Sequence, residues 1–341
     1  MKEKYQMLEE IIEQKEILSS LISSAELKEE ISRLKSKIKP SGRIFLVGSG
    51  SSYNAALFAS HLLSEKNSLL ASAYQASDFV NYLQDLKKND LVFLISQSGE
   101  SRDILNLIKP LKKAEVTLVA ITNSENSTLA ESSQIRLFLS AGSIVAVPAT
   151  KTFSATLVLF IIISAVLSGV DYKGDKKIIV EINKMFSKRS LLEIKRLSQR
   201  LLAHDKIFIL GEGLDYPLAL EAALKIKECA LVEAEGFSAH EFCHGPIALV
   251  KRGLPLIIIS TDSQYFDDQK DVWAKVRKTG GKIFAFSTKN SQLFSDIFPI
   301  ADCGIYSSVL AAIAIQLLSY FLAIKKKNNP DKPPGLDVVV R

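Results

Sequence analysis

A run of hydroxyl and amide side chains stands where an apolar segment gives way to a helical pattern. The apolar segment covers residues 91–95, and the helical pattern begins at Ile104. Between them lie Ser96, Gln97, Ser98, Gly99, Glu100 and Ser101. A strand that ends in such a turn and leads into a helix forms an anion pocket, because the free N–H groups and the dipole of the helix start favour negative charge. Uncharged donors in this number suit a phosphate monoester better than a free carboxylate or a nucleic-acid backbone. The alternative is an ordinary serine cap.

A glycine-rich turn, Gly48-Ser49-Gly50, also follows an apolar run and precedes a helical pattern. It lacks the third glycine of a dinucleotide-binding turn, since Tyr53 stands there, and no acidic residue ends the next predicted strand. Both omissions argue against a nicotinamide cofactor. The glycines still allow close backbone approach, so Ser51 and Ser52 can join the phosphate pocket.

The segment His240-Glu241-Phe242-Cys243-His244 matches the H-E-x-x-H pattern of zinc proteases. That chemistry needs a helix and a third ligand. Here Gly245-Pro246 stops the helix at once, and no histidine follows His244. We therefore predict no metal site. The competing structural interpretation is a pair of core histidines, above all for His240.

Composition narrows the class of protein. The chain has 341 residues, of which 47% are hydrophobic, which suggests about two domains with ample cores. The formal charge of +6 is spread along the chain, and its main basic run, residues 325–327, has no aromatic partners, which disfavours nucleic-acid binding. Three scattered cysteines and a charged N-terminus without a signal-type apolar region favour a reducing cytoplasm.

Two apolar stretches, residues 153–170 and 305–324, are long enough to cross a membrane. Each contains several serines, and neither has a flanking lysine asymmetry. They also occupy equivalent places in an internal repeat, which a pair of membrane anchors would not explain. We expect buried helices and no membrane partner.

The repeat has a spacing of 163 residues: residues 43–53 resemble residues 206–216, and Glu65 corresponds to Glu228. In the first half, β-rich runs alternate with helical patterns, which favours parallel sheets with helices on both faces. The expected strands lie near 43–48, 69–74, 90–95, 116–121 and 135–139. The expected helices lie near 52–65, 76–84, 100–112 and 126–131. Ligands then bind at the carboxyl ends of the strands.

The predicted fold is α/β, with two tandem doubly wound, flavodoxin-like subdomains of parallel sheet and a helical N-terminal arm. The expected boundaries are residues 1–38 for the arm, 39–170 for the first subdomain, 171–203 for a helical connector, 204–328 for the second subdomain and 329–341 for the tail. In the second half, Ser260-Thr261-Asp262-Ser263 takes the place of the hydroxyl-rich run. Its acidic residue would stand where phosphate would sit, so we expect only the first half to hold phosphate.

Several motifs together resemble the sugar isomerase (SIS) domain family. They are residues 96–101, the Gly-x-Gly-x-x-Tyr-Asn start, Ala149-Thr150-Lys151, residues 221–228 and residues 241–246. The resemblance covers about residues 40 to 336. The sequence is similar to the isomerase half of glucosamine-6-phosphate synthase and to stand-alone glucosamine-6-phosphate deaminases.

The resemblance implies roles for matched positions. Ser52, Ser96, Gln97, Ser98 and Ser101 would bind the sugar phosphate, and Val147 and Ala149 would line the sugar. Glu228 would be the base that moves a proton between C1 and C2. His244 would assist ring opening from the neighbouring subunit, which implies a homodimer with shared active sites.

General chemistry supports these roles. Aldose–ketose conversion needs one carboxylate to remove and return a carbon-bound proton, and a group near neutral pKa for the ring oxygens, with no metal or organic cofactor. The alternative for Glu228 is a solvated helix glutamate. Two departures from the pattern of the synthase indicate the subfamily. No cysteine precedes Cys229, so we expect no glutaminase, and Val338 stands where the synthase tail carries its imine-forming lysine. Whether Lys332 replaces that lysine is left open.

The degradative reaction is therefore favoured: a phosphorylated amino sugar, glucosamine 6-phosphate, becomes fructose 6-phosphate and ammonia. The alternatives are an aldose–ketose isomerase, a fructosamine-6-phosphate deglycase, and a non-catalytic sugar-phosphate sensor.

Overall fold

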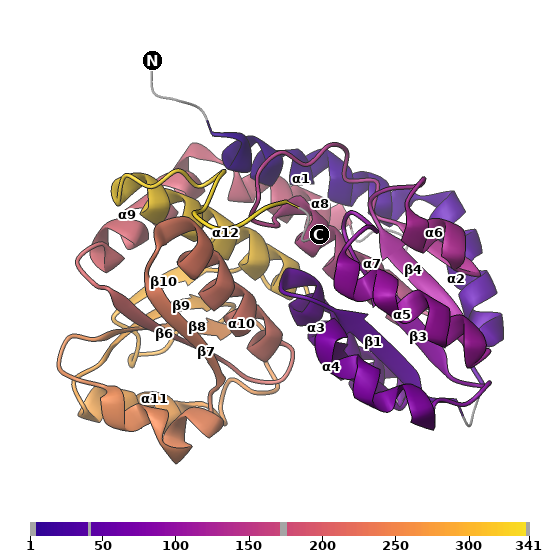
Figure 1. Ribbon diagram of the computed structural model, residues 1–341. Coiled ribbons are helices and arrows are strands. Elements are labelled where there is room, and N and C mark those ends of the chain that lie inside the picture. The colour runs from indigo at the N-terminus through magenta and orange to yellow at the C-terminus, as the bar shows by residue number, and fades with distance from the viewer. Residues whose placement is uncertain (1–4, 40–41, 171–175, 339–341) are drawn as a thin grey trace. The chain divides into compact units, whose positions relative to one another are not determined.

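The computed structural model describes residues 5–39, 42–170 and 176–338, whose contacts form two compact units (Figure 1). The N-sheet unit contains residues 16–144, 151–175 and 337–341, and the C-sheet unit contains residues 1–15, 145–150 and 176–336. Four stretches lie outside the described residues: the first four of the predicted arm, residues 40–41 of the predicted first subdomain, the first five of the predicted connector and the last three of the tail.

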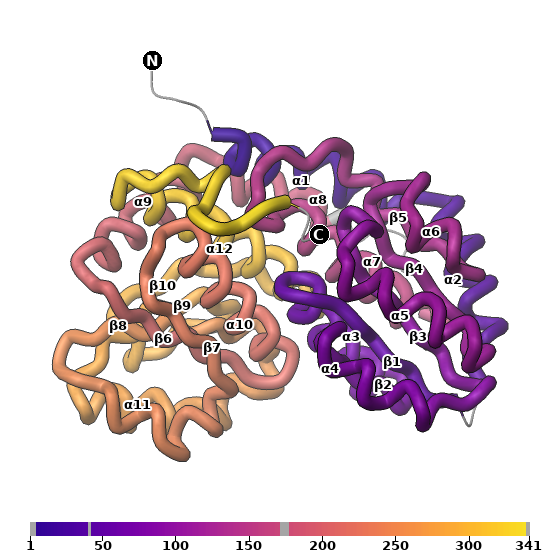
Figure 2. Tube along the Cα trace, in the orientation of Figure 1, coloured from indigo at the N-terminus to yellow at the C-terminus, as the bar shows by residue number. Residues whose placement is uncertain are grey.

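Each unit holds one five-stranded sheet in which every strand pair is parallel. The N-sheet strands are β1 (Ile44–Gly48), β2 (Ala71–Gln75), β3 (Leu91–Ile95), β4 (Thr117–Thr122) and β5 (Ile135–Phe138). The C-sheet strands are β6 (Lys206–Gly211), β7 (Glu233–Ser238), β8 (Pro255–Ser260), β9 (Lys282–Ser287) and β10 (Asp296–Pro299). The orders, β2-β1-β3-β4-β5 and β7-β6-β8-β9-β10, are the same when each sheet is counted from its first strand (Figure 2). The predicted doubly wound repeat is confirmed.

Helices lie between most successive strands and flank the sheets. The N-sheet unit contains α2 (Ala25–Lys37), α3 (Ser51–Asn67), α4 (Ala76–Phe79), the 3-10 helix η1 (Val80–Asp85), α5 (Arg102–Lys113), α6 (Thr128–Ser132) and α7 (Lys151–Leu167). The C-sheet unit contains α8 (Lys176–Met185), α9 (Lys188–Leu201), α10 (Asp215–Lys225), η2 (Ile226–Ala230), η3 (Glu241–His244), η4 (Pro246–Leu249), α11 (Lys270–Lys278) and α12 (Ser307–Lys325). Helix α1 (Gln6–Ser23) contributes residues to both units.

The two long apolar stretches form helices α7 and α12, each buried within its own unit. Among the described residues, one segment is long and apolar enough to cross a membrane, Gly304–Lys325, and 89% of its most apolar window is buried. Its hydroxyls and amide have partners inside the fold: Ser319 Oγ donates to the Ile315 carbonyl, and Gln316 Nε2 donates to the Thr150 carbonyl at 3.1 Å. Helix α12 is thus a core helix of the C-sheet unit.

The repeat extends to the packing of aromatic rings. In the N-sheet unit, Phe45, Tyr74 and Phe79 form a cluster with centroids 5.4–5.8 Å apart. The residues 163 positions later, Phe208, Phe237 and Phe242, form the same cluster with centroids 5.2–5.9 Å apart. Residues that are equivalent in the sequence repeat therefore occupy equivalent positions in the two cores.

The first turn of each half is fixed by a glycine. A Cβ atom on Gly48 would lie 2.7–2.9 Å from atoms of Ser52, and one on Gly211 would overlap the backbone carbonyl of Asp215. Both glycines end the first strand of a sheet, so each allows the following helix to begin close against the strand. Ser52 and Asp215 thereby occupy the same place in the two halves.

Candidate active site

The hydroxyl-rich run forms a tight turn between β3 and α5. Gly99 has a φ of +68°, and a Cβ atom there would overlap Ser127, so the turn requires glycine. The carboxylate of Glu100 faces away from the serines, because it accepts from the backbone N–H of Thr128 at 2.6 Å and from its hydroxyl at 3.0 Å. The acidic residue of the motif is therefore engaged at the start of α6.

Ser101 takes the N-cap position of α5, yet its side chain makes no capping hydrogen bond. Its Oγ lies 3.1 Å from Ser96 Oγ, and Ser96 Oγ accepts from the Gly99 N–H at 3.2 Å. The alternative of an ordinary serine cap does not hold, because the hydroxyls bond to one another and leave the helix start open.

The predicted phosphate ligands gather at the carboxyl ends of two neighbouring strands. Strand β1 pairs with β3, and a hydrogen bond from the Ser49 hydroxyl to Asp103 ties the glycine-rich turn to the start of α5. Ser51 and Ser52 lie in the first turn of α3. Within the described part of the chain, the backbone N–H groups of Gln97 and Ser98 have no hydrogen-bond partner. The result is a half-buried set of N–H and hydroxyl donors in the N-sheet unit, suited to an oxyanion.

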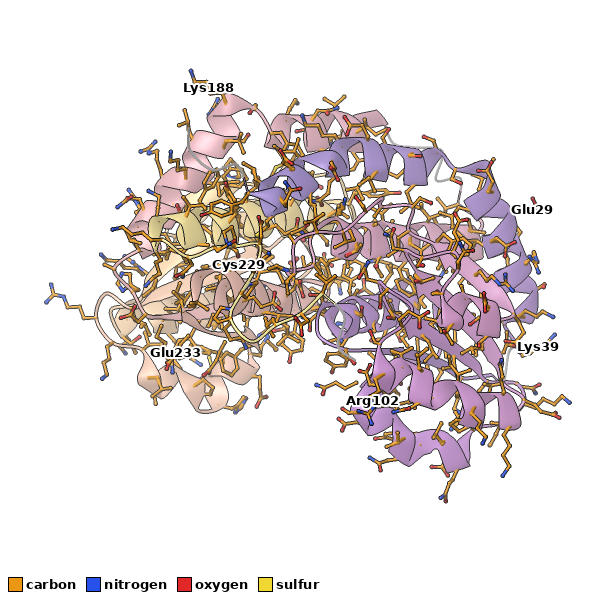
Figure 3. All side chains as sticks on the ribbon, turned by 45° about the horizontal axis from the view of Figure 1, so that its top comes forward. Glu29, Lys39, Arg102, Lys188, Cys229 and Glu233 are labelled. Carbon is orange, nitrogen blue, oxygen red and sulfur yellow. The ribbon has the colours of Figure 1, made fainter. Side chains whose placement is uncertain are left out.

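Glu228 lies in the C-sheet unit, on the π-helical segment η2 that continues α10 (its neighbour Cys229 is labelled in Figure 3). π-Helical turns are rare and often mark functional positions. The Glu228 side chain is 17% exposed and bonds to the ammonium of Lys225, which is 1% exposed and lies 3.6 Å from Glu221. Glu228 is therefore held by a buried cation and is not the solvated glutamate of the alternative interpretation.

Burial by itself would lower the pKa of Lys225, but the charges of Glu221 and Glu228 outweigh it and hold that pKa above its ordinary value. The lysine is charged at any physiological pH. Sequence reasoning missed Lys225 and Glu221 as site residues. The signal was the spacing Glu221-x-x-x-Lys225-x-x-Glu228, which places all three side chains on one helix face.

The predicted sugar-lining segment belongs to the same unit as Glu228. The N–H of Val147 donates to the Asp331 carbonyl at 3.0 Å, and the Asp331 carboxylate accepts from the N–H groups of Gln6 and Met7. Met7 Sδ in turn lies 3.7 Å from Cys229 Sγ. Ala149 is half-buried beside Thr150. The tail, the start of α1, the Val147 segment and the Glu228 segment are thus joined by direct contacts.

The H-E-x-x-H segment forms a 3-10 helix, η3, and not the α-helix of a zinc protease. At three residues per turn, positions four apart do not share a face. Phe242 is buried in the aromatic cluster, whereas His240 is 54% exposed and lies 3.1 Å from Glu212. The alternative interpretation of His240 as a core histidine does not hold, because Phe242 supplies the core contact. His244 is exposed, and within the described residues no hydrogen bond or ion pair joins it to Glu228.

The second half has a carboxylate in the equivalent anion pocket, but it is not the one expected. Asp215 is fully buried, and its Oδ2 accepts from the N–H groups of Thr261 at 2.7 Å and Asp262 at 3.2 Å. The side chain of Asp262 instead accepts from the Gln264 N–H. The sequence predicted an acidic side chain in this turn but identified Asp262 instead of Asp215. The sequence alone did not show that the start of α10 reaches the turn after β8.

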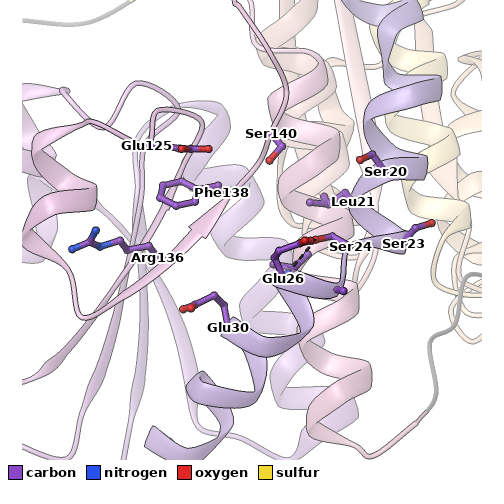
Figure 4. Close-up of a pocket in the computed structure, with 12 residues that line it drawn as sticks. Ser20, Leu21, Ser23, Ser24, Glu26, Glu30, Glu125, Arg136, Phe138 and Ser140 are labelled. Atoms are coloured by element: carbon purple, nitrogen blue, oxygen red, sulfur yellow. Dashed lines mark hydrogen bonds between the residues drawn. The ribbon is translucent and has the colours of Figure 1, made fainter.

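A separate hollow lies where α1 meets α2, within the N-sheet unit (Figure 4). It has a volume of about 650 Å³, and Glu26, Glu30, Arg136 and Phe138 are among its lining residues. None of the predicted site residues lines it.

Two five-stranded parallel sheets of the same strand order define a duplicated α/β fold. The SIS domain family model matches residues 37–163 and 201–320, and the chain belongs to this family.

Curated relatives share the whole described fold but are longer. The glutamine–fructose-6-phosphate aminotransferase [isomerizing] of Sulfolobus acidocaldarius is 34% identical over 322 residues, which cover 94% of this chain and 53% of the relative. The enzyme of the same name from Chlamydia abortus is 32% identical, with 97% and 58% covered. The chain spans about half the length of these relatives.

Solved structures match over nearly their full length. The C-terminal domain of glucosamine-fructose-6-phosphate aminotransferase from Francisella tularensis superposes with a TM-score of 0.85 at 29% identity, covering 97% of this chain and 99% of that domain. Glucosamine-6-phosphate deaminase from Thermotoga maritima gives a TM-score of 0.79 at 27% identity, covering 98% and 99%.

Proposed function

We propose that this chain is a phosphosugar deaminase-isomerase that converts glucosamine 6-phosphate and water to fructose 6-phosphate and ammonia. The observation that carries the proposal is the donor set at residues 96–101, where two N–H groups without a partner among the described residues meet several hydroxyls. In the second half, the two equivalent N–H groups hold a carboxylate, which supports an oxyanion as the ligand of this backbone arrangement.

The proposed chemistry uses Glu228 as the proton carrier. In the open-chain sugar, Glu228 removes the C2 proton while the C1 carbonyl oxygen takes up a proton, which gives an enolamine. Glu228 then returns its proton to C1, and the electron pair forms a C2 imine. Water adds to the imine, and the C–N bond breaks to release ammonia and the C2 ketone. Lys225 orients the Glu228 carboxylate through the buried ion pair.

Ring opening is assigned to His244, supplied by a second copy of the chain in a homodimer. His244 is exposed, and among the described residues no hydrogen bond or ion pair joins it to Glu228, which supports a role outside its own subunit. Val147 and Ala149 would line the sugar, and the enzyme would act in the cytoplasm without a cofactor.

A second candidate function is favoured by the aminotransferase relatives, which are named for the synthetic reaction. In that case the chain would supply the isomerase activity of an aminotransferase. Val338, at the position where the resemblance implies a lysine, favours the degradative direction instead.

The test is direct. Purified protein is given glucosamine 6-phosphate without glutamine, and ammonia and fructose 6-phosphate are measured. Equal amounts of both products are expected. The reverse mixture contains fructose 6-phosphate with glutamine or with ammonium. Formation of glucosamine 6-phosphate from it would favour the second candidate function over the first. Turnover of a different phosphosugar alone would reject the deaminase assignment.

Site variants locate the chemistry. Glu228→Gln should lose turnover by at least about 100-fold and keep phosphosugar binding. Its matched control is Glu65→Gln, at the equivalent position of the repeat, where Glu65 pairs with Lys66 at 2.5 Å on the surface. The control should retain activity. Ser98→Ala should mainly weaken phosphosugar binding, and an unchanged affinity would count against the pocket.

A further inference from the structure

The phosphate-type pocket exists twice in this chain, and its second copy is filled from within. Val47 pairs with Leu94 in the first sheet, and the corresponding Leu210 pairs with Ile258 in the second. Three residues beyond Leu94 and Ile258 stand Gln97 and Thr261. The N–H groups of Gln97 and Thr261 therefore occupy equivalent places, as do those of Ser98 and Asp262.

In the second copy, a carboxylate occupies these donors. Asp215 Oδ2 accepts from both N–H groups, and Oδ1 accepts from the Thr261 hydroxyl. Thr261 Oγ1 also lies 3.3 Å from Ser308 Oγ, at the start of α12. Two backbone N–H groups and a hydroxyl around an oxyanion repeat the donor types of the first pocket. Asp215 stands where the first half has Ser52, whose side chain is shorter and neutral.

The carboxylate stays there despite a cost. Burial raises the pKa of Asp215 to about 6, and the hydrogen bonds from Thr261 offset part of that effect. Asp215 is therefore mostly ionised at neutral pH, and its negative charge meets three hydrogen-bond donors. An uncharged residue at this position would avoid the cost of burial but would leave those donors without an acceptor.

Asp215 also begins α10, which runs directly into η2 and Glu228. An anchor at the first residue of a helix limits its sliding and rotation. The contacts of Asp215 reach the end of β8, so the position of α10 relative to the C-sheet depends on this carboxylate.

We infer that Asp215 is an internal oxyanion that permanently occupies the second phosphate-type pocket, excludes a second phosphosugar from the chain, and acts as a positioning residue for Glu228. The part concerning Glu228 rests on the proposed function. The part concerning the filled pocket does not.

The first experiment compares the full wild-type chain with Asp215→Ser, which copies Ser52 into the second half. Thermal unfolding is followed in equal concentrations of sodium chloride and sodium formate, formate being a small oxyanion that fits the vacated volume. The variant should unfold roughly 5–10 °C lower in chloride. Formate should recover part of that loss. The wild type should unfold at the same temperature in formate and in chloride. If Asp215→Ser unfolds at the wild-type temperature in chloride, the inference of a filled pocket is overturned. The same holds if formate recovers none of the variant's loss.

The activity readout separates positioning from general damage. In Asp215→Ser, kcat for glucosamine 6-phosphate should fall tenfold to hundredfold, with KM within about threefold and partial recovery of kcat in formate. An unchanged kcat would overturn the positioning role. If the wild type does not turn over this sugar, the proposed function fails, and the formate comparison still decides the filled pocket.

A reciprocal variant keeps the inference testable even if Asp215→Ser folds poorly. Ser52→Asp should place a carboxylate in the first pocket, and Ser52→Asn is its neutral control. Inorganic phosphate should raise the unfolding temperature of the wild type and, more weakly, of Ser52→Asn. It should have no effect on Ser52→Asp, which should be as stable as the wild type without phosphate. If phosphate raises the unfolding temperature of Ser52→Asp as much as that of the wild type, the equivalence of the two pockets is overturned.

Discussion

The buried ammonium of Lys225 offers the sharpest test of the site. Lys225→Met preserves the length and apolar volume of the side chain but removes the charge. Glu221, 4% exposed, and Glu228, 17% exposed, then lose the cation between them. Removal of one partner from a buried ion pair costs about 3 to 5 kcal/mol, because the remaining charge has no compensation. In a unit of this size the unfolding temperature should fall by roughly 10 °C.

The pH dependence follows from the direction of the shift. The pKa of Lys225 is raised in the folded state, so its stabilisation is complete below the unfolded value of about 10.4 and is lost only as the pH rises through the higher folded value. The cost of Lys225→Met should therefore be constant from about pH 6 to 9.

The assay is thermal and urea unfolding at several pH values, together with turnover of the phosphosugar. Lys227→Met is the matched control, because Lys227 is exposed on the same segment and should matter by less than about 0.5 kcal/mol. Glu221→Gln in the Lys225→Met background should recover much of the loss. A cost below about 1 kcal/mol for Lys225→Met at pH 7, or no recovery in the double variant, would refute the ion-pair reasoning.

Three further outcomes are expected. Gly99→Ala should lose at least about 2 kcal/mol and weaken phosphate binding in calorimetry, because the left-handed backbone and the overlap with Ser127 both oppose a Cβ. Asp90→Asn should cost about 2 to 4 kcal/mol at pH 7. Burial opposes ionisation of Asp90, but hydrogen bonds from Arg43 lower its pKa, so in unfolding curves the difference should be lost only as the pH falls below about 3.9. Phe242→Leu should cost about 1 to 3 kcal/mol and impair kcat through the displaced His244 segment.

The sheets could be predicted because their central strands, β1, β3 and β8 among them, are short apolar runs bounded by turn residues. Strand β3, for example, was expected at residues 90–95 and spans Leu91–Ile95. The donors of the anion pocket predicted for the first half are contiguous in the sequence, so their common place at the end of β3 could also be predicted. The spacing of Gly48 and Gly50 then placed a second set of hydroxyls at the neighbouring strand end.

What the sequence did not reveal are contacts between distant residues. By its contacts, the stretch Val145–Thr150 belongs to the C-sheet unit, where the Val147 N–H meets the Asp331 carbonyl and the Glu10 carboxylate accepts from the N–H groups of Val145 and Ala146. Nothing local in residues 145–150 indicates these partners, because each lies more than a hundred positions away. The Asp215–Thr261 contact, which joins residues 46 positions apart, was also missed.

The duplicated fold explains how two similar halves can differ in chemistry. Where the first half has Ser52, the nearby N–H groups have no partner among the described residues, and where the second has Asp215, the equivalent N–H groups bind its carboxylate. Where the second half has Glu228 beside a buried lysine, the first has Glu65 beside the half-exposed Lys66. In each case the backbone positions are equivalent, and the divergence lies in one side chain and its immediate partner. The proposed division between anchoring in the first half and proton transfer in the second rests on these two differences.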